Sequence, residues 1–335
     1  MTSEGGRPRV VVVFTGGTIS MLADPETGAA RPALDGAAIL ARTPGLGELA
    51  EVEPVDWGLV SASHLSFDQI LDIARIVRQA LGRPDVDGAV VVQGTDTMEE
   101  TAIAWDVLVD SPKPVVVVGA MRHAADPGYE GPANLRDAVR AAAAPGLWHQ
   151  GTVVVMGGAI LSAADVVKTD TDRYDAFEAP NLGPLGDIRG GEVRVHRRRE
   201  SRATLPAVPA HAAEPVDLLM ATVAADDRLA RCSVASGARG IVMAAAGAGN
   251  TSPALLEAGR DAIAAGIPVV LATRVLAGRA RAAYGFPGGG AQWLDVGAIP
   301  AGTLSGYKAR VVLALALGAG LDDAALRRLF ATLGA

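Results

Sequence analysis

Two apolar stretches that break off into glycine and threonine constrain the fold of this chain more than any other feature. Residues 10–20 read VVVVFTGGTIS, and residues 90–101 read VVVQGTDTMEET. A continuous apolar run is typical of a strand that is buried on both faces of a parallel sheet. Open α/β sheets bind their ligands in the crevice beyond the carboxyl ends of the strands. If the two strands are neighbours, Thr15 and Thr95 face one another across such a crevice, and we expect the chemistry of the protein there.

Strand and helix patterns alternate along the first part of the chain. Strands that alternate with helices indicate βαβ units, so the sequence predicts an α/β fold with a doubly wound, mainly parallel sheet. Thr97 and Glu100 have the spacing of a capping box at the start of one of these helices. The expected strands are residues 52–60, 87–93, 115–118 and 151–156, and the expected helices are residues 39–49, 67–81, 101–109 and 132–144.

A second, smaller α/β domain is expected in the last third of the chain. Strand-like runs lie at residues 216–221, 240–244 and 268–272, with helical stretches between them. Residues 189–214 are basic and then rich in proline and alanine without a clear period. We interpret the basic run at residues 196–199 as a solvated part of a linker. The predicted organisation is an N-terminal catalytic α/β domain over residues 1–195, a linker over residues 196–214 and a C-terminal α/β domain over residues 215–335.

Two segments of the first domain show no regular period. Residues 16–36 carry Gly, Pro, Asp and Thr, a composition typical of a loop. A structureless loop of this length is usually a lid or a disordered segment, and we expect a mobile lid over residues 20–34. Residues 163–179 turn polar and fit no amphipathic pattern.

Composition and charge argue against several classes of protein. The 335 residues carry a net charge of −7, which is not expected of a general nucleic-acid binder. No uncharged apolar run of about 18 residues appears, so we expect no membrane span. Residues 1–9 lack the regions of a signal peptide, and the single cysteine, Cys232, can form no internal disulfide, so a cytoplasmic location is expected. No cluster with metal-ligand spacing and no phosphate-binding loop follows a strand, so we expect neither a metal nor a cofactor.

Lysine is rare in this chain. Of its 30 lysines and arginines, only Lys113, Lys168 and Lys308 are lysines. Arginine serves wherever a positive charge is needed, but it cannot lose its proton in a protein. A lysine in such a chain is therefore a candidate for chemistry that requires deprotonation.

Threonine, aspartate and lysine side chains form a set that suits chemistry on an amino acid. The hydroxyl of Thr15 or Thr95 is a weak nucleophile and needs a base, which a partly desolvated Lys168 can supply. Free N–H groups at the start of the helix after Thr95 favour an anion, and Asp96 favours an ammonium group. Taken singly, each threonine is more often a turn or cap residue, and Lys168 more often part of a surface ion pair. The other two lysines are expected to serve only charge or solubility.

Four motifs follow one another in a characteristic order along the chain. They are TGGTI at residues 15–19, GTDTMEET at residues 94–101, GAMR at residues 119–122 and KT at residues 168–169. Together they resemble the bacterial-type L-asparaginase/glutaminase family. The match continues through residues 131–135, 247–250 and 302–304, so it covers nearly the whole chain. The first two motifs are specific, whereas the later glycine-rich ones are weak individually. The resemblance implies a two-domain α/β fold, a site at the carboxyl ends of the N-terminal strands, and homotetramers built from tight dimers.

The resemblance also implies a role for each matching residue. Thr15 is the nucleophile that attacks the side-chain amide carbon of the substrate and forms an acyl-enzyme. Thr95, Asp96 and Lys168 form a second set that moves the proton. Asp96 also holds the α-ammonium group of the substrate, and the carbonyl of Ala120 accepts a hydrogen bond from the amide nitrogen. The expected reaction converts L-asparagine to L-aspartate and ammonia without a metal or cofactor.

The chain departs from the family pattern where the substrate is recognised. Ala62 and Ser63 fall where the family holds the α-carboxylate, and Ala62 replaces the usual serine. Family members often carry a tyrosine on the lid, hydrogen-bonded to the nucleophile, but the first tyrosine of this chain is Tyr129. Arg31 lies near the expected place and can only donate hydrogen bonds, so we expect it to bind a substrate carboxylate. Asn250 is a candidate for a residue that a partner subunit contributes.

Two other functions stay open at this point. One is a related amidase that acts on glutamine, a D-amino acid or a larger amide. The other is a non-catalytic protein that binds an amino acid, although the presence of both threonines, the aspartate and the lysine weighs against it. Whether the protein is an asparaginase or a related amidase, we expect a small amino-acid amide as the substrate and a homotetramer or homodimer. We expect no nucleic-acid or membrane partner.

Overall fold

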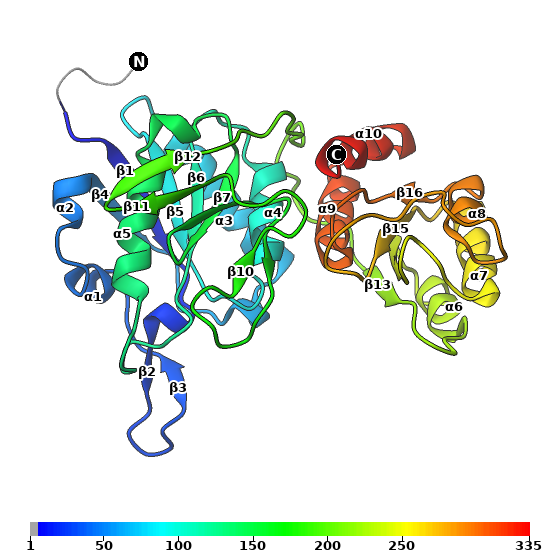
Figure 1. Cartoon of the computed structure of the whole chain (residues 1–335), viewed down its shortest axis with the longest axis horizontal. Helices are drawn as coiled ribbons and strands as arrows, with labels where there is room; N and C mark the ends of the chain where they lie inside the picture. The colour runs from blue at the N-terminus through cyan, green and yellow to red at the C-terminus, as the bar shows by residue number, and fades with distance from the viewer. Residues whose placement is uncertain (1–5) are drawn as a thin grey trace. The chain divides into compact units, whose positions relative to one another are not determined.

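The computed structural model describes residues 6–335 and separates into two compact units. The described residues up to Glu200 form the first unit, and Ser201–Ala335 form the second (Figure 1). The expectation for residues 1–9 lies largely outside the described part of the chain. Among residues 6–335, none of the helices combines the length and the apolar character that a membrane crossing requires.

The first unit is built on an eight-stranded sheet with the order β12-β11-β8-β7-β6-β5-β1-β4. The neighbouring strands β4, β1, β5, β6 and β7 pair in parallel. At the other edge, β8, β11 and β12 pair antiparallel with their neighbours. This arrangement confirms the predicted mainly parallel sheet. The strands are β1 (Arg9–Phe14), β4 (Glu51–Asp56), β5 (Gly88–Val92), β6 (Val115–Val118), β7 (Thr152–Met156), β8 (Ala159–Ser162), β11 (Gly186–Arg189) and β12 (Glu192–Val195).

Helices cover both faces of this sheet, as the doubly wound pattern requires. The helices α3 (Phe67–Leu81) and α4 (Met98–Leu108) contact each other on one face, and α5 (Gly131–Ala142) packs on β5–β7 on the other (Figure 1). The helix α3 has the predicted bounds because Ser66 and Gln69 form a complete capping box at its start. The smaller helices are α1 (Gly36–Ala41), α2 (Leu46–Leu49), η1 (Thr18–Ser20), η2 (Ala62–His64) and η3 (Pro145–Leu147).

The capping box predicted at Thr97 and Glu100 is wrong. The helix α4 begins at Met98, and the Thr97 side chain does not cap it. The Thr97 hydroxyl instead donates to the carbonyl oxygen of Ala62 at 2.9 Å. A contact between segments 35 residues apart therefore takes the side chain that local spacing assigns to the helix.

Both segments without a sequence period contain a short hairpin. After η1, the strands β2 (Met21–Ala23) and β3 (Ala30–Pro32) pair antiparallel, and the hairpin projects from the body of the first unit (Figure 1). The expectation of a structureless segment there is wrong. In the polar segment, β9 (Val167–Lys168) pairs with β10 (Phe177–Glu178). Strands of two or three residues are too short to produce a visible alternation.

The basic run near the end of the first unit is not uniformly solvated. Arg199 is nearly buried and pairs at 2.8 Å with Asp106, which is fully buried in α4. Asp106 also accepts a hydrogen bond from the N–H of Thr152, at the start of β7. The interpretation of Arg199 as a solvated linker residue is therefore wrong, because a buried carboxylate requires a charged partner.

The second unit is a smaller parallel sheet with helices on both faces, which confirms the predicted fold class of the C-terminal part. Its strand order is β13-β14-β15-β16, and every neighbouring pair is parallel. The helix α9 packs on β13–β15, and α6, α7 and α8 follow one another on the opposite face (Figure 1). The elements are β13 (Val216–Met220), α6 (Arg228–Ala235), β14 (Gly240–Ala245), α7 (Pro253–Ala264), β15 (Val269–Thr273), α8 (Gly290–Asp295), β16 (Ile299–Pro300), α9 (Gly306–Gly318) and α10 (Asp323–Leu333).

Candidate active site

The candidate site lies where the strand order of the first sheet reverses. The strand β1 has β4 on one side and β5 on the other, so successive crossovers leave β1 in opposite directions. A crevice opens beyond the carboxyl ends of parallel strands at such a point. Phe14 at the end of β1 is in register with Val92 at the end of β5. Thr15 and the segment from Gln93 to Thr95 therefore leave the sheet side by side.

Two glycines allow the loops after β1 and β5 to touch. Gly17 has a φ of +89°, and a Cβ atom there would lie 2.1 Å from the backbone nitrogen of Gly94. A Cβ atom on Gly94 would in turn lie 2.9 Å from the Cβ of Ala62. No side chain fits at either glycine without a shift of the backbone. The TGGT and GTDT motifs thus have a steric reason for their glycines.

Thr15 is almost completely buried directly after β1. It is 1% exposed, and its Oγ1 donates to the carbonyl oxygen of Val92 at 3.0 Å. Its N–H donates to the same carbonyl oxygen at 2.9 Å. Both bonds hold the residue against the end of β5, next to the loop that carries Thr95.

Lys168 joins Thr95 and Asp96 into one polar chain. Its Nζ donates to Thr95 Oγ1 at 2.9 Å and to Asp96 Oδ1 at 2.9 Å. The lysine side chain is 14% exposed, whereas the Asp96 side chain is 71% exposed. The amine and the Thr95 hydroxyl are therefore screened from solvent, while the carboxylate faces outward, where a ligand can reach it.

A buried glutamate that sequence reasoning missed supports Lys168. Glu99, in the first turn of α4, is 8% exposed, and its Oε2 accepts a hydrogen bond from the backbone N–H of Lys168 at 3.3 Å. This contact ties β9 to the start of α4 and places the lysine over Thr95. The signal in the sequence was an acidic residue within the GTDTMEET motif, but spacing alone could not show that it would be buried.

The other expected binding residues surround this group in different ways. Ala62 is buried in η2, where its carbonyl accepts from Thr97, and Ser63 is exposed with its hydroxyl 3.2 Å from that of Ser61. Ala120 is fully buried two residues after β6, the strand beside β5. Three neighbouring strands therefore end at Thr15, at the Thr95 loop and at Ala120.

Arg31 lies apart from this group. It is on β3 of the projecting hairpin, and its guanidinium pairs with Asp24 of the same hairpin at 3.1 Å. The Arg31 side chain is 64% exposed. None of its contacts among the described residues connects it with Thr15 or Lys168, so a role in binding would require it to leave Asp24.

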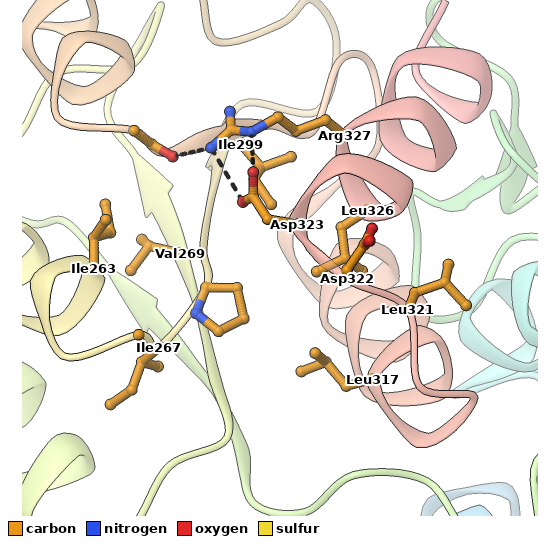
Figure 2. Close-up of a pocket in the computed structure, with 13 residues that line it drawn as sticks. Ile263, Ile267, Val269, Ile299, Leu317, Leu321, Asp322, Asp323, Leu326 and Arg327 are labelled. Atoms are coloured by element: carbon orange, nitrogen blue, oxygen red, sulfur yellow. Dashed lines mark hydrogen bonds and ion pairs between the residues drawn. The ribbon is translucent and has the colours of Figure 1, made fainter.

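A separate cavity of about 530 Å³ lies within the second unit (Figure 2). Its lining includes aliphatic side chains of α7, α9, α10, the starts of β15 and β16, and the loops that contain Ile267 and Leu321. Arg327 at its edge is already paired with Asp323 and donates to the carbonyl oxygen of Gly297 (Figure 2). Asp322, which also lines the cavity, accepts a hydrogen bond from the N–H of Ala325 at 2.8 Å, so each charged group of the lining already has a partner in the second unit. Among residues 6–335, no group of three or more His, Cys, Asp or Glu residues is placed to hold a metal ion.

Two family models match the chain from near its beginning to near its end. The model of the asparaginase N-terminal domain matches residues 9–201, and the model of the glutaminase/asparaginase C-terminal domain matches residues 215–330.

Individual relatives resemble the chain over nearly its full length. A probable L-asparaginase of Deinococcus radiodurans is 36% identical over 331 residues, which cover 96% of this chain and 97% of the relative. A probable periplasmic L-asparaginase of Haemophilus influenzae is 32% identical, over 96% of this chain and 92% of the relative. The crystal structure of a probable cytoplasmic L-asparaginase from Campylobacter jejuni matches with a TM-score of 0.86 and 30% identity, over 97% of this chain and 100% of that one.

Proposed function

The chain belongs to the asparaginase family, and on that premise we propose that it hydrolyses L-asparagine to L-aspartate and ammonia at Thr15. Family membership makes it an asparaginase-type hydrolase. The observation that carries the assignment of the site is the contact of Lys168 Nζ with both Thr95 Oγ1 and Asp96 Oδ1, at 2.9 Å each. An amine, a hydroxyl and a carboxylate in contact provide a route for a proton beside a buried threonine.

In the proposed mechanism, Thr15 Oγ1 attacks the side-chain amide carbon of the substrate. The hydroxyl first gives up its bond to the Val92 carbonyl, and its proton passes through Thr95 to an unprotonated Lys168. Asp96 then stabilises the ammonium form of the lysine. The proton moves on to the leaving nitrogen, ammonia departs, and a water molecule hydrolyses the acyl-enzyme by the same route.

Substrate recognition in this proposal uses groups around the same crevice. The exposed carboxylate of Asp96 binds the α-ammonium group, and the Ala120 carbonyl accepts from the amide nitrogen. Ser63 and the backbone near Ala62 bind the α-carboxylate. Because Ala62 has no hydroxyl, one hydrogen bond to that carboxylate is missing, which favours a weaker grip on the substrate than a serine would give.

We also propose that the protein works as a homotetramer or homodimer. In the single chain, the second unit exposes large apolar side chains near the carboxyl ends of β13 and β15, namely Met220 at 57%, Val223 at 95% and Leu276 at 56%. Covering exposed apolar side chains with a partner subunit is favourable, because it removes apolar surface from water. Asn250, in the loop after β14, has a buried Oδ1 without a hydrogen-bond partner among the described residues, and it is our candidate for a contribution to a partner's site.

A cytoplasmic location is likewise a proposal. It is supported by the single exposed cysteine and by the likeness to the Campylobacter protein, which is named as probably cytoplasmic. The Haemophilus relative is named as periplasmic. Fractionation of the source cells followed by immunodetection of the protein distinguishes the two compartments.

Ammonia release from a panel of amides tests the proposed activity. The panel contains L-asparagine, D-asparagine, L-glutamine and a dipeptide with C-terminal asparagine, each with the wild-type protein and with Thr15→Ala. We expect turnover of L-asparagine by the wild type alone. Preferred turnover of another amide would replace the substrate but keep the site. Binding of asparagine by calorimetry without any ammonia release would instead favour an amino-acid-binding protein.

A further inference from the structure

The segment that follows Thr15 is anchored by a loop more than a hundred residues further along the chain. The hydroxyl of Tyr129 donates to the carbonyl oxygen of Ile19 at 2.8 Å, and the N–H of Ala124 donates to the carbonyl oxygen of Met21 at 3.0 Å. Ile19 lies directly after the TGGT turn, and Met21 is the first residue of β2 in the hairpin. We call residues 121–130, which supply both donors, the clamp loop.

Residues 17–21, which contain both acceptors and join the TGGT turn to the hairpin, make further backbone hydrogen bonds. We call this segment the hinge. The N–H and hydroxyl of Ser20 donate to the carbonyl oxygen of Gly17 at 2.9 and 2.7 Å. The carbonyl oxygen of Ser20 accepts from Ala33 and Leu34, where the chain returns from the hairpin, at 2.9 Å each. Hydrogen bonds therefore connect the base of the hairpin to the loop that follows Thr15. Ile19 lies between the two and is fully buried.

The clamp loop is itself held in shape. The carboxylate of Glu130 accepts hydrogen bonds from the N–H groups of Met121 and Arg122, which closes the loop on itself. The Arg122 guanidinium lies over the Tyr174 ring at 5.1 Å from its centroid. The Tyr129 ring rests on Gly131, where a Cβ atom would lie 2.3 Å from the tyrosine hydroxyl oxygen. The tyrosine is therefore placed by its surroundings and not only by its one hydrogen bond.

We propose that Tyr129 is a positioning residue for the reaction, because its hydroxyl fixes the hinge between the nucleophile loop and the β2–β3 hairpin. This inference rests on the proposed function of Thr15. A fixed Ile19 carbonyl holds the segment only four residues from the nucleophile, and it gives the hairpin a defined base about which to close over the substrate. Groups near a reacting atom need a geometry held within a fraction of an ångström for full activity.

The role of the hydroxyl is that of a donor and not of an acid or base. Burial raises the pKa of Tyr129 to about 12, with Glu130 adding to the shift and Arg42 opposing it. The phenol therefore stays protonated at every pH at which the enzyme is assayed. Its acceptor is a backbone carbonyl, which exchanges no proton.

The test combines steady-state kinetics with hydrogen–deuterium exchange on Tyr129→Phe. We expect kcat to fall about five- to tenfold, as the loss of one hydrogen bond of ordinary strength allows, with KM changed less than about twofold. The pH profile keeps its shape because the phenol does not titrate in that range. Peptides that cover residues 16–34 should exchange faster, and those of the second unit should be unchanged.

Tyr174→Phe is the matched control. It removes a phenol hydroxyl from the same neighbourhood, one that makes no hydrogen bond within the described residues, and it keeps the ring beneath Arg122. We expect wild-type kinetics and exchange from it. Gly131→Ala is a second test variant. It keeps the Tyr129 hydroxyl, but the new Cβ atom displaces the tyrosine ring, so the variant should reproduce the effect of Tyr129→Phe.

Two results would overturn the inference. One is a Tyr129→Phe protein with wild-type kcat and unchanged exchange over residues 16–34. The other is a uniform loss of protection and of melting temperature across the first unit, which would mean a general packing role. If the wild-type protein turned over none of the amides, the exchange experiment would still report on the hinge, so that failure of the proposed function is distinguishable from failure of this inference.

Discussion

Thr15 in the first unit and Thr273 in the second occupy comparable places and differ in what their hydroxyls can do. Each lies at the carboxyl end of a buried parallel strand, and each donates to a carbonyl oxygen at or just after the end of the neighbouring strand. For Thr15 the acceptor is Val92 at 3.0 Å, and for Thr273 it is Gly247 at 2.6 Å. The exposed fractions are also similar, at 1% and 5%.

The two threonines differ in whether the hydroxyl oxygen also accepts a hydrogen bond and in the residues at the adjacent strand end. Thr273 Oγ1 also accepts from the N–H of Val275 at 3.1 Å, so it locks the turn after β15. Thr15 Oγ1 accepts no hydrogen bond within the described part of the chain, and the Lys168–Thr95 pair lies at the adjacent strand end. The same architecture thus supports a structural threonine in one sheet and a candidate nucleophile in the other. The site, and not the fold, carries the function.

The largest expected effect compares these two threonines directly. Thr15→Ala should lower kcat by about a thousandfold or more, as loss of a nucleophile does in other hydroxyl-based sites. Thr273→Ala should leave kcat within about twofold and lower the free energy of unfolding by about 1–3 kcal/mol, because it removes two hydrogen bonds of ordinary strength. Stopped ammonia assays and urea denaturation measure the two quantities.

Either half of this comparison can fail. If Thr15→Ala kept a tenth of the wild-type activity, the nucleophile would have to be another group. A collapse of kcat in folded Thr273→Ala would show that the strand ends of the second unit also serve catalysis, as they would in an assembly where one subunit completes the site of another.

The next effect concerns the amine that distinguishes Thr15 from Thr273. Lys168→Arg keeps the positive charge but removes the ability to take up a proton, so kcat should fall about a hundredfold or more, nearly as far as in Lys168→Met. Lys113→Arg is the matched control. The Lys113 ammonium donates to the carbonyl oxygens of Leu81, the last residue of α3, and of Arg83 just after it, which an arginine can also do. Substantial activity in Lys168→Arg would make the role of Lys168 purely electrostatic.

Lys308 does not serve as a second control, and the reason is instructive. The sequence led us to expect a residue that serves only charge or solubility, but Lys308 is fully buried in α9. That expectation is wrong. A count of lysines gives a short list of candidates, but it cannot separate a catalytic amine from one that is enclosed in a core.

The fold was predictable wherever a local pattern was complete. The apolar run at residues 115–118 became β6, and the amphipathic run after the Ser66 capping box became α3, each with the expected bounds. Such signals are local because a buried strand and an amphipathic helix show their environment in their own residues. The two short hairpins carry no such signal, since their pairing depends on the surrounding structure.

The candidate site was predictable in its residue types and less so in its contacts. The strand ends suggested that Thr15 and Thr95 lie together, the scarcity of lysine gave a list of three candidates, and the KT motif at residues 168–169 selected Lys168 from it. The contacts that hold the site bridge distant segments: Lys168 reaches Thr95 across 73 residues, and Thr97 reaches Ala62 across 35. Glu99 and Tyr129 also make contacts between distant segments, and such contacts emerge only once the chain is folded.

The smallest expected effect concerns the hairpin that follows Thr15, which we expect to supply Arg31 to the substrate. Arg31→Ala should raise KM about three- to fivefold and change kcat little, the signature of a contact made equally in the ground and transition states.

The matched variant is Asp24→Asn. The N–H groups of Thr27 and Glu26, aided by Arg31, hold the pKa of Asp24 below its ordinary value, so this carboxylate stays ionised and keeps its pair with Arg31 at neutral pH. An asparagine can still accept the two backbone bonds through Oδ1 while it releases the guanidinium from the position of Oδ2. If Arg31 binds a substrate carboxylate, Asp24→Asn should therefore lower KM below the wild-type value. A collapse of kcat at unchanged KM in Arg31→Ala would contradict the carboxylate role, because it would mean that the guanidinium acts only in the transition state.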